Sequence, residues 1–193
     1  MIGRGVASAR HGRGFFGLEN TEGSSAVRTK TIVTVGLLIA VSVILTRLFG
    51  FMVPVGGVMG LRISFGELPI YLSGILFGPL VGAAAGAMAD LIGVAVAGID
   101  FFPGFTLSAA LAGFVPGLLL YPHRSNLRLP RLLVTLILTG FLVTLLNTYW
   151  VVLLYRAAVV ALLPPRLISR AVMIPLHAGI LWLLIKRVRV DGL

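Results

Sequence analysis

The sequence predicts an all-α integral membrane protein with six transmembrane helices and both termini in the cytoplasm. Composition is the first observation behind this prediction: 58% of the 193 residues are hydrophobic and 11% are charged, and the mean hydropathy is +1.06. Such values are typical of integral membrane proteins. The second observation is a series of apolar segments near the length of about 20 residues that a helix needs to cross the bilayer core. The third is that Lys and Arg form short clusters between these segments, as membrane topology signals do.

The predicted elements follow the apolar runs and the glycine and proline breaks between them. Residues 1–29 are polar, glycine-rich and basic, and we expect a disordered cytoplasmic tail. Residues 30–193 should form one six-helix transmembrane domain. The six helices are predicted at residues 31–49, 63–78, 80–97, 105–121, 132–155 and 166–185.

Glycine and proline set several of these boundaries. Residues 50–62 are interrupted by glycines and a proline and are predicted to be an apolar loop. Gly78 and Pro79 divide a run that is too long for one helix. Residues 157–165, which end in two prolines, are predicted to be a short connection, and Pro116 should kink the fourth helix.

Topology follows from the basic clusters. The N-terminal region, the loop that contains Arg124 and the C-terminal cluster that begins at Lys186 should all be cytoplasmic by the positive-inside rule. An even number of crossings must therefore separate each pair of clusters. Four helices before Arg124 and two after it satisfy this requirement.

Five arginines would then lie at or near the outer face with few acidic residues to balance them. The arginines are Arg47, Arg62, Arg156, Arg166 and Arg170, and the acids are Glu67, Asp90 and Asp100. A charge near the hydrocarbon is retained when it faces a partner or a wet cavity. We therefore predict a site for a carboxylate or phosphate ligand. The alternative is that the arginines reach lipid headgroups or pair internally with Glu67 or Asp90.

Asp90 is the most isolated of the candidate binding residues, because it lies in the middle of a predicted helix among uncharged residues. Its carboxylate could accept paired hydrogen bonds from the amidine-like edge of a heterocycle. It could equally pair with an arginine or cap neighbouring backbone.

Aromatic and amide side chains complete the candidate site. Tyr71 lies one helical turn from Glu67, and Phe101, Phe102 and Phe105 could stack on a flat ring. Membrane-interface aromatics are also ordinary belt residues. Asn147, with Tyr149 and Trp150, forms a polar group in a long apolar helix, where hydrogen bonding between helices is the commoner role. His177, beside a proline, suits a structural role better than metal binding.

No enzymatic role is expected. The sequence has no cysteine, no His-Glu metal motif, no paired acidic cluster and no Walker-type phosphate loop. We therefore predict no catalytic residue, no metal and no cofactor. Nucleic acid is not an expected partner either, because the basic residues are not interleaved with exposed aromatics.

Small residues at four-residue spacing allow close helix approach. Gly36 and Ala40 form such a pair in the first predicted helix, and a predicted role is docking onto a partner membrane subunit. Gly82 and Gly86 repeat the spacing in the third helix. Packing within one bundle is the ordinary explanation for both pairs.

Three stretches resemble the substrate-binding S components of energy-coupling factor (ECF) vitamin transporters, and most closely the folate-specific members. They are GLLIAVSVILTR (residues 36–47), RISFGELPIYLSGILFGPLVGAAAGAMADLIG (62–93) and FFPGFTLSAALAGFVPGLLL (101–120). The last two predicted helices match only in general character. The resemblance implies that residues 30–193 form a substrate-binding domain that captures a vitamin from outside. It also implies association with a transmembrane coupling subunit and two cytoplasmic ATPases in a prokaryotic cell membrane.

The resemblance also suggests roles for the candidate residues. Folate joins a pterin to an anionic glutamate tail, so arginines would bind carboxylates, Asp90 or Glu67 would bind the pterin's donor edge, and aromatic rings would stack. Gly36 and Ala40 correspond to the family's docking pair, with Gly36 where Ala is usual. The apolar loop would gate the site. The alternatives are an S component for another anionic vitamin, such as pantothenate, and a membrane scaffold without a small ligand.

Overall fold

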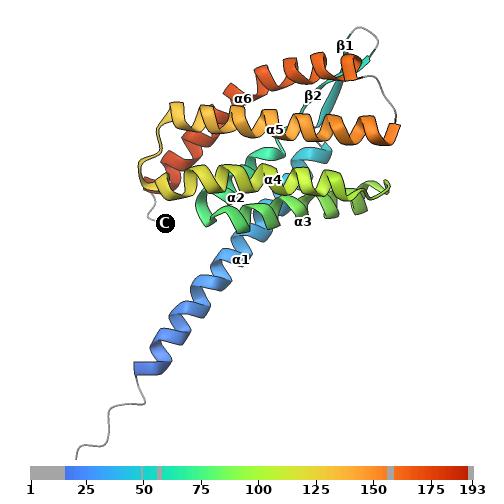
Figure 1. Ribbon diagram of the computed structural model, residues 1–193. Coiled ribbons are helices and arrows are strands. Elements are labelled where there is room, and N and C mark those ends of the chain that lie inside the picture. Colours follow the sequence, from blue (N-terminus) through green and yellow to red (C-terminus); the bar gives the residue numbers. More distant parts are fainter. Residues whose placement is uncertain (1–15, 49, 56–57, 156–158, 191–193) are drawn as a thin grey trace, which may run out of the picture. The chain divides into compact units, whose positions relative to one another are not determined.

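The computed structural model describes residues 16–48, 50–55, 58–155 and 159–190 (Figure 1). The chain divides into two compact units, Met1–Thr34 and Val35–Leu193. The described part contains six α-helices, one 3-10 helix and one two-stranded sheet. In chain order the elements are α1 (Phe16–Leu48), β1 (Phe51–Val55), β2 (Val58–Ile63), α2 (Glu67–Phe77), α3 (Pro79–Ala97), α4 (Pro103–Leu120), η1 (Tyr121–Asn126), α5 (Leu129–Tyr155) and α6 (Val159–Val190).

The first helix begins earlier than the sequence predicted. We expected its start at Thr31, but α1 already includes Phe16. Residues 16–29, which were assigned to the tail, are therefore helical, and residues 1–15 lie outside the described residues. Leu, Glu and Ala in this stretch favour a helix, and glycine is its main helix-breaking residue.

Most described residues of the predicted loop at residues 50–62 belong to two paired strands, so that prediction was wrong. Strands β1 and β2 are antiparallel, with Phe51 opposite Ile63 and Val55 opposite Val58. The register shifts between Val53 and Pro54, where the proline has no N–H to donate. The β-branched and large apolar residues that made the loop unusually hydrophobic are also those that favour strands.

The break between α2 and α3 confirms the prediction from Gly78 and Pro79. Gly78 has φ of 101°, a value that L side chains rarely adopt, and Pro79 begins α3. Helix α3 then packs against α4 through backbone contacts. A side chain at Gly86 would meet the carbonyl group of Ala109. The small residues of the third predicted helix therefore serve packing within the bundle.

Helix α6 differs from the prediction at its start. The connection predicted at residues 157–165 is shorter, because α6 begins at Val159 and contains Pro164 and Pro165. Prolines are tolerated in helices of membrane proteins, because neighbouring groups satisfy the backbone carbonyls that they leave unpaired. Arg166 and Arg170 therefore lie inside a helix rather than at its first turn.

Within the Val35–Leu193 unit the helices form a layered bundle. Helix α4 lies between α3 and α5, α6 packs on α5, and α2 packs against α3, α4 and α6 (Figure 1). Strand β2 packs on α6. Ile75, Leu120, Leu132 and Leu181 are fully buried at the centre of the core. The core therefore joins α2, α4, α5 and α6.

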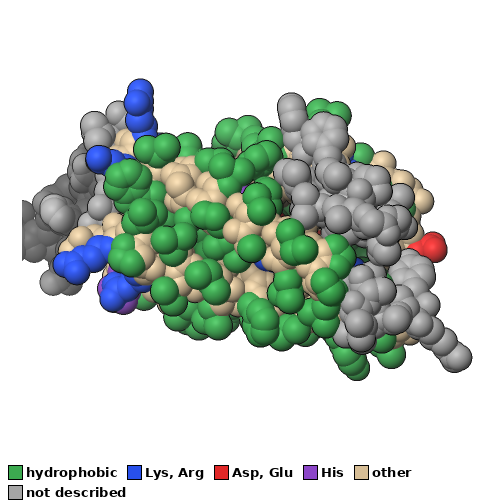
Figure 2. Space-filling model, turned by 90° about the horizontal axis from the view of Figure 1, so that it is seen from above, with side chains coloured by type: hydrophobic (Ala, Val, Ile, Leu, Met, Phe, Trp, Pro, Cys, Tyr) green, Lys and Arg blue, Asp and Glu red, His purple; other side chains and the backbone are tan. Residues whose placement is uncertain are grey.

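The outside of the bundle is apolar, as expected for a protein surrounded by lipid. Figure 2 shows hydrophobic side chains over the middle of one face and Lys and Arg side chains gathered toward one end. Within the described residues, five stretches are long and apolar enough to cross a membrane: Thr29–Leu48, Pro79–Ala97, Pro103–Arg124, Leu129–Leu154 and Leu163–Arg187. Glu67–Phe77 is apolar but shorter. The helices are thus those of a multi-pass membrane protein.

Candidate functional site

An ion pair between α2 and α6 is the centre of the candidate site. Arg170 Nη1 lies 2.5 Å from Glu67 Oε2, and the Tyr71 hydroxyl donates to the same oxygen at 2.6 Å. Arg170 Nε also donates to Thr144 Oγ1 on α5 at 3.0 Å. The four side chains therefore connect three helices. The pairing of Glu67 with an arginine matches the internal-pairing alternative of the sequence analysis.

His177 fixes the segment that precedes α2. Its Nε2 lies 3.2 Å from the carbonyl oxygen of Ser64, and its ring makes edge-to-face contacts with Phe65 and Tyr71 at 6.1 and 6.0 Å. The ring is 2% exposed. These contacts support the predicted structural role of His177 and hold the end of the hairpin against α6.

Helix α1 holds the other side of this segment. Ser42 Oγ donates to the Gly66 carbonyl at 2.6 Å, and a Cβ at Gly66 would collide with Thr46. Glycine is therefore required where α1 passes the start of α2. This contact helps to place Glu67, the next residue, within the bundle.

The described arginines have separate partners. Arg47 donates through Nη2 to the Gly93 carbonyl of α3, and Arg166 donates to Thr148 Oγ1 of α5 at 2.9 Å. Arg170 contacts α2 and α5, as described above. Their recorded bonds thus fall on three different helices. The side chain of Arg62, in β2, and the whole of Arg156 lie outside the described residues.

Asp90 has a neutral partner. Thr106 Oγ1 of α4 donates to Asp90 Oδ2 at 2.7 Å. The carboxylate is half-buried between α3 and α4. Because an ionised carboxylate has about four acceptor positions, one threonine leaves it able to accept further hydrogen bonds.

An aromatic group lies where α4 begins and α5 ends. The ring of Phe102 makes edge-to-face contacts with Phe105 at 5.6 Å and Trp150 at 5.7 Å. Tyr149 continues the group, 4.9 Å from Trp150. Phe101 is 54% exposed. Of the phenylalanines proposed for stacking, Phe102 and Phe105 are thus packed together, and Phe101 is largely exposed.

Two buried polar atoms beside this aromatic group have no hydrogen-bond partner among the described residues. They are Asn147 Oδ1 and Trp150 Nε1. An unsatisfied buried polar group costs about 1–3 kcal/mol. The sequence analysis named Trp150 together with Asn147 but placed only Asn147 among the binding residues. Their three-residue spacing, which places both on one face of a helix, was the signal that could have identified the pair.

The predicted docking residues lie on an open surface. Ala40 is exposed, and a Cβ at Gly36 would have no neighbour within 4 Å. This part of α1 can therefore accept a partner helix at close range.

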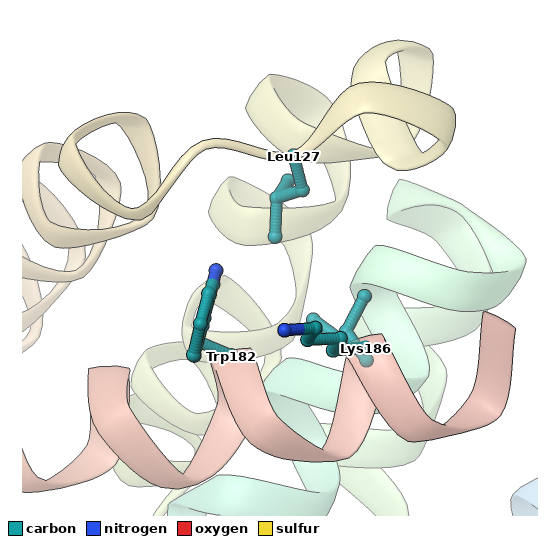
Figure 3. A pocket seen from close by; sticks show the side chains of 4 residues that line it. Leu127, Trp182 and Lys186 are labelled. Atoms are coloured by element: carbon teal, nitrogen blue, oxygen red, sulfur yellow. The ribbon is translucent and has the colours of Figure 1, made fainter. Parts of the chain in front are cut away.

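A separate cavity of about 200 Å³ is lined by Leu127, Trp182, Ile185 and Lys186 (Figure 3). The Lys186 ammonium lies 5.1 Å from the centre of the Trp182 ring. Arg170 and Lys186 are about 24 Å apart along α6 at 1.5 Å per residue. This cavity is therefore distinct from the polar cluster around Glu67.

The described candidate residues thus comprise carboxylates on α2 and α3, a cation on α6, an amide on α5 and an aromatic group at the ends of α4 and α5. The recorded contacts join the cluster around Glu67, the pair Asp90–Thr106 and the aromatic group each within itself. Carboxylates and amides bind the polar edges of heterocycles, arginines bind anions, and aromatic side chains pack against flat rings. These residue types suit an aromatic ligand that carries negative charge.

Comparison with known proteins identifies the family. The model for the substrate-specific component of ECF transporters matches residues 30–185. The chain belongs to this family. A relative of this substrate-specific component, the folate transporter FolT of Clostridium novyi (strain NT), is 30% identical over 168 residues, which cover 84% of the chain and 94% of the relative. A second folate transporter FolT, from Leuconostoc mesenteroides, is 27% identical and covers 81% of the chain and 85% of the relative.

Solved structures agree with the family assignment. The crystal structure of FolT bound with folic acid has a TM-score of 0.70 and 31% sequence identity, and covers 81% of this chain and 93% of that chain. The S component of a bacterial ECF transporter has a TM-score of 0.61 at 22% identity and covers 85% and 98% of the two chains. The latter supports the fold alone. The relatives named here are transporter components and not enzymes.

Proposed function

We propose that this chain is the membrane subunit that captures folate and delivers it to an ATP-driven ECF transport complex. One observation carries the proposal: the chain is similar to FolT bound with folic acid, at 31% identity over 93% of that chain. The relatives from Clostridium novyi and Leuconostoc mesenteroides, both folate transporters, support the same substrate.

The chemistry of folate fits the residue types of the site. A pterin ring has donor groups that a carboxylate can accept and a flat face that aromatic rings can cover, and the glutamate tail has carboxylates that arginines can bind. The residues that we propose for folate binding are Arg47, Arg62, Glu67, Tyr71, Asp90, Phe101, Phe102, Asn147 and Arg170. Because Arg170 is already paired with Glu67, we propose that ligand binding exchanges part of this bond for ligand contacts.

We also propose that α2 is a sixth, short crossing and that both termini are cytoplasmic. The basic residues support this topology. Arg124, Arg128, Arg131, Lys186 and Arg187 are exposed at the ends of α4, α5 and α6, as the positive-inside rule requires of cytoplasmic segments. The six-crossing domain comprises residues 30–193, and residues 1–29 form its cytoplasmic tail. Arg47, Arg166 and Arg170 then lie toward the outside.

The partners that we propose are a transmembrane coupling subunit and two cytoplasmic ATPases in a prokaryotic plasma membrane. Membership of the ECF transporter family supports them. The exposed pair Gly36 and Ala40 supports α1 as the docking surface.

Thermal unfolding in detergent tests the substrate. The purified chain is heated with folic acid, 5-formyltetrahydrofolate, pantothenate, riboflavin or thiamine, each at several concentrations. A ligand present at 100 times its dissociation constant adds about 2.7 kcal/mol of stability. We expect a higher melting temperature with the folates alone. Stabilisation by pantothenate alone would identify another anionic vitamin, and no shift with any vitamin would favour the scaffold.

A further inference from the structure

The unpaired polar atoms of Asn147 and Trp150 stand out against the rest of α5. Its buried threonines have their hydroxyls bonded: Thr135, Thr139 and Thr148 donate to carbonyls four residues earlier. By contrast, Asn147 Oδ1 and Trp150 Nε1 are the buried side-chain nitrogen or oxygen atoms of the described residues that lack a partner. Buried polar groups are normally satisfied, so each exception calls for a physical reason.

The two atoms differ in chemistry and share a location. The indole N–H can only donate, whereas the amide oxygen can only accept. Residues three apart on a helix are neighbours on its surface, so both side chains project from one face of α5. One acceptor next to one donor on a ligand would satisfy both atoms together.

The Trp150 ring cannot easily turn its N–H toward water. A Cβ at Gly104 would lie 2.6 Å from Trp150 Cδ2, so the backbone of α4 lies directly against the ring. Phe102 and Tyr149 also make edge-to-face contacts with it. The indole is therefore held in one orientation, and its polar atom is positioned by packing rather than by a hydrogen bond.

We propose that Trp150 Nε1 and Asn147 Oδ1 form hydrogen bonds with the amide edge of the ligand's heterocycle. This inference rests on the proposed function and goes beyond it by assigning one part of the ligand to two residues. Folic acid has a ring carbonyl at position 4 beside a ring N–H at position 3. The carbonyl accepts from the Trp150 N–H, and the ring N–H donates to the Asn147 oxygen.

The 4-amino analogue of folic acid inverts this edge. Its amino group is a donor where the carbonyl was an acceptor, and its N3 has no hydrogen. The Trp150 N–H would then face a donor, and the Asn147 oxygen would face an acceptor. A site that is built to bond a specific group rejects analogues that leave its own polar atoms unpaired. The two residues should therefore select the oxo form.

The test measures the affinities of the full-length protein in detergent for folic acid and its 4-amino analogue by titration calorimetry. Trp150→Phe keeps an aromatic ring and removes the N–H, and Asn147→Leu keeps the approximate size of the side chain and removes the amide. Trp182→Phe is the control, because Trp182 lines the separate cavity. Melting temperatures without ligand establish that each variant is folded.

We expect the wild type and the control to prefer folic acid by about tenfold or more, and Trp150→Phe and Asn147→Leu to weaken folic acid binding by about tenfold. Binding of the 4-amino analogue should change less than threefold, so the preference collapses. Unchanged preference in both variants, or equal loss for both ligands, would overturn the proposal and would indicate that water pairs with these atoms. If Trp150→Phe fails to fold, the proposal is tested by the ratio of the affinities of Asn147→Leu for folic acid and the 4-amino analogue. A wild type that binds neither ligand would instead refute the proposed function.

Discussion

Breaking the ion pair between Glu67 and Arg170 should destabilise the folded protein, because the remaining charge stays largely buried. Arg170→Met removes the guanidinium and leaves the Glu67 carboxylate with the Tyr71 hydroxyl as its recorded partner. Removing one member of a buried pair costs about 3–5 kcal/mol, because the other charge remains buried and uncompensated. The two side chains are 19% and 28% exposed, so we expect the lower end of that range, about 3 kcal/mol.

The assay is thermal unfolding in detergent of the wild type, Arg170→Met, Glu67→Gln and the double variant. A loss of about 3 kcal/mol lowers the melting temperature by about 6–12 °C in a chain of this size. Each single variant should show this decrease. The double variant has no unpaired charge at this position, so its loss should be smaller than the sum of the single losses by about 3 kcal/mol.

The control is Arg128→Met, because Arg128 is an exposed arginine directly before α5. This substitution should change stability by less than about 0.5 kcal/mol. Additive losses in the double variant would refute the reasoning, because they would mean that the two side chains act independently. Single losses below about 1 kcal/mol would also refute it, because that is the range of a solvent-exposed pair.

Three further predictions follow from particular contacts. Gly113→Ala should destabilise the protein by about 1–3 kcal/mol in thermal unfolding, because its Cβ would lie 1.9 Å from the Gly82 carbonyl oxygen; Gly179→Ala, at an open position, should not. Asp90→Ala should weaken folate binding by about 1.5–3 kcal/mol in calorimetry if the carboxylate bonds the ligand, and unchanged affinity would remove it from the site. A leucine at Gly36 should leave folate affinity intact but abolish uptake by whole cells, because it would keep the partner helix at a distance; normal uptake would exclude α1 as the docking surface.

Local sequence signals predicted the helices of the bundle well. Gly78 and Pro79 marked the break between α2 and α3, because both residues disfavour helix continuation and one of them needs positive φ. The spacing of Glu67 and Tyr71 predicted neighbours on one helix face, and the two side chains are hydrogen bonded. These features depend on residues that are close in sequence, so local rules describe them.

Features that depend on distant residues were not predictable in the same way. Glu67 and Arg170 are 103 positions apart, and the sequence left open whether an arginine meets a ligand or an acid. The hairpin was missed because its apolar residues carry no alternation that separates a strand from a buried loop. Trp150 was named beside Asn147 but not assigned to the site, because its unpaired N–H becomes evident only when Phe102 and Gly104 lie against the ring.

Helix α2 is too short to cross the hydrocarbon core of a bilayer by itself. Its 11 residues extend about 16 Å, roughly half of a hydrocarbon core of about 30 Å. If α2 is a crossing, extended backbone completes the other half. Extended chain within the bilayer must find partners for its N–H and C=O groups outside its own segment. The two strands satisfy each other along one edge, and the opposite edges depend on neighbouring protein or on a ligand. We therefore expect a hairpin at membrane depth to stay against the bundle, because its displacement would expose unpaired amides to lipid.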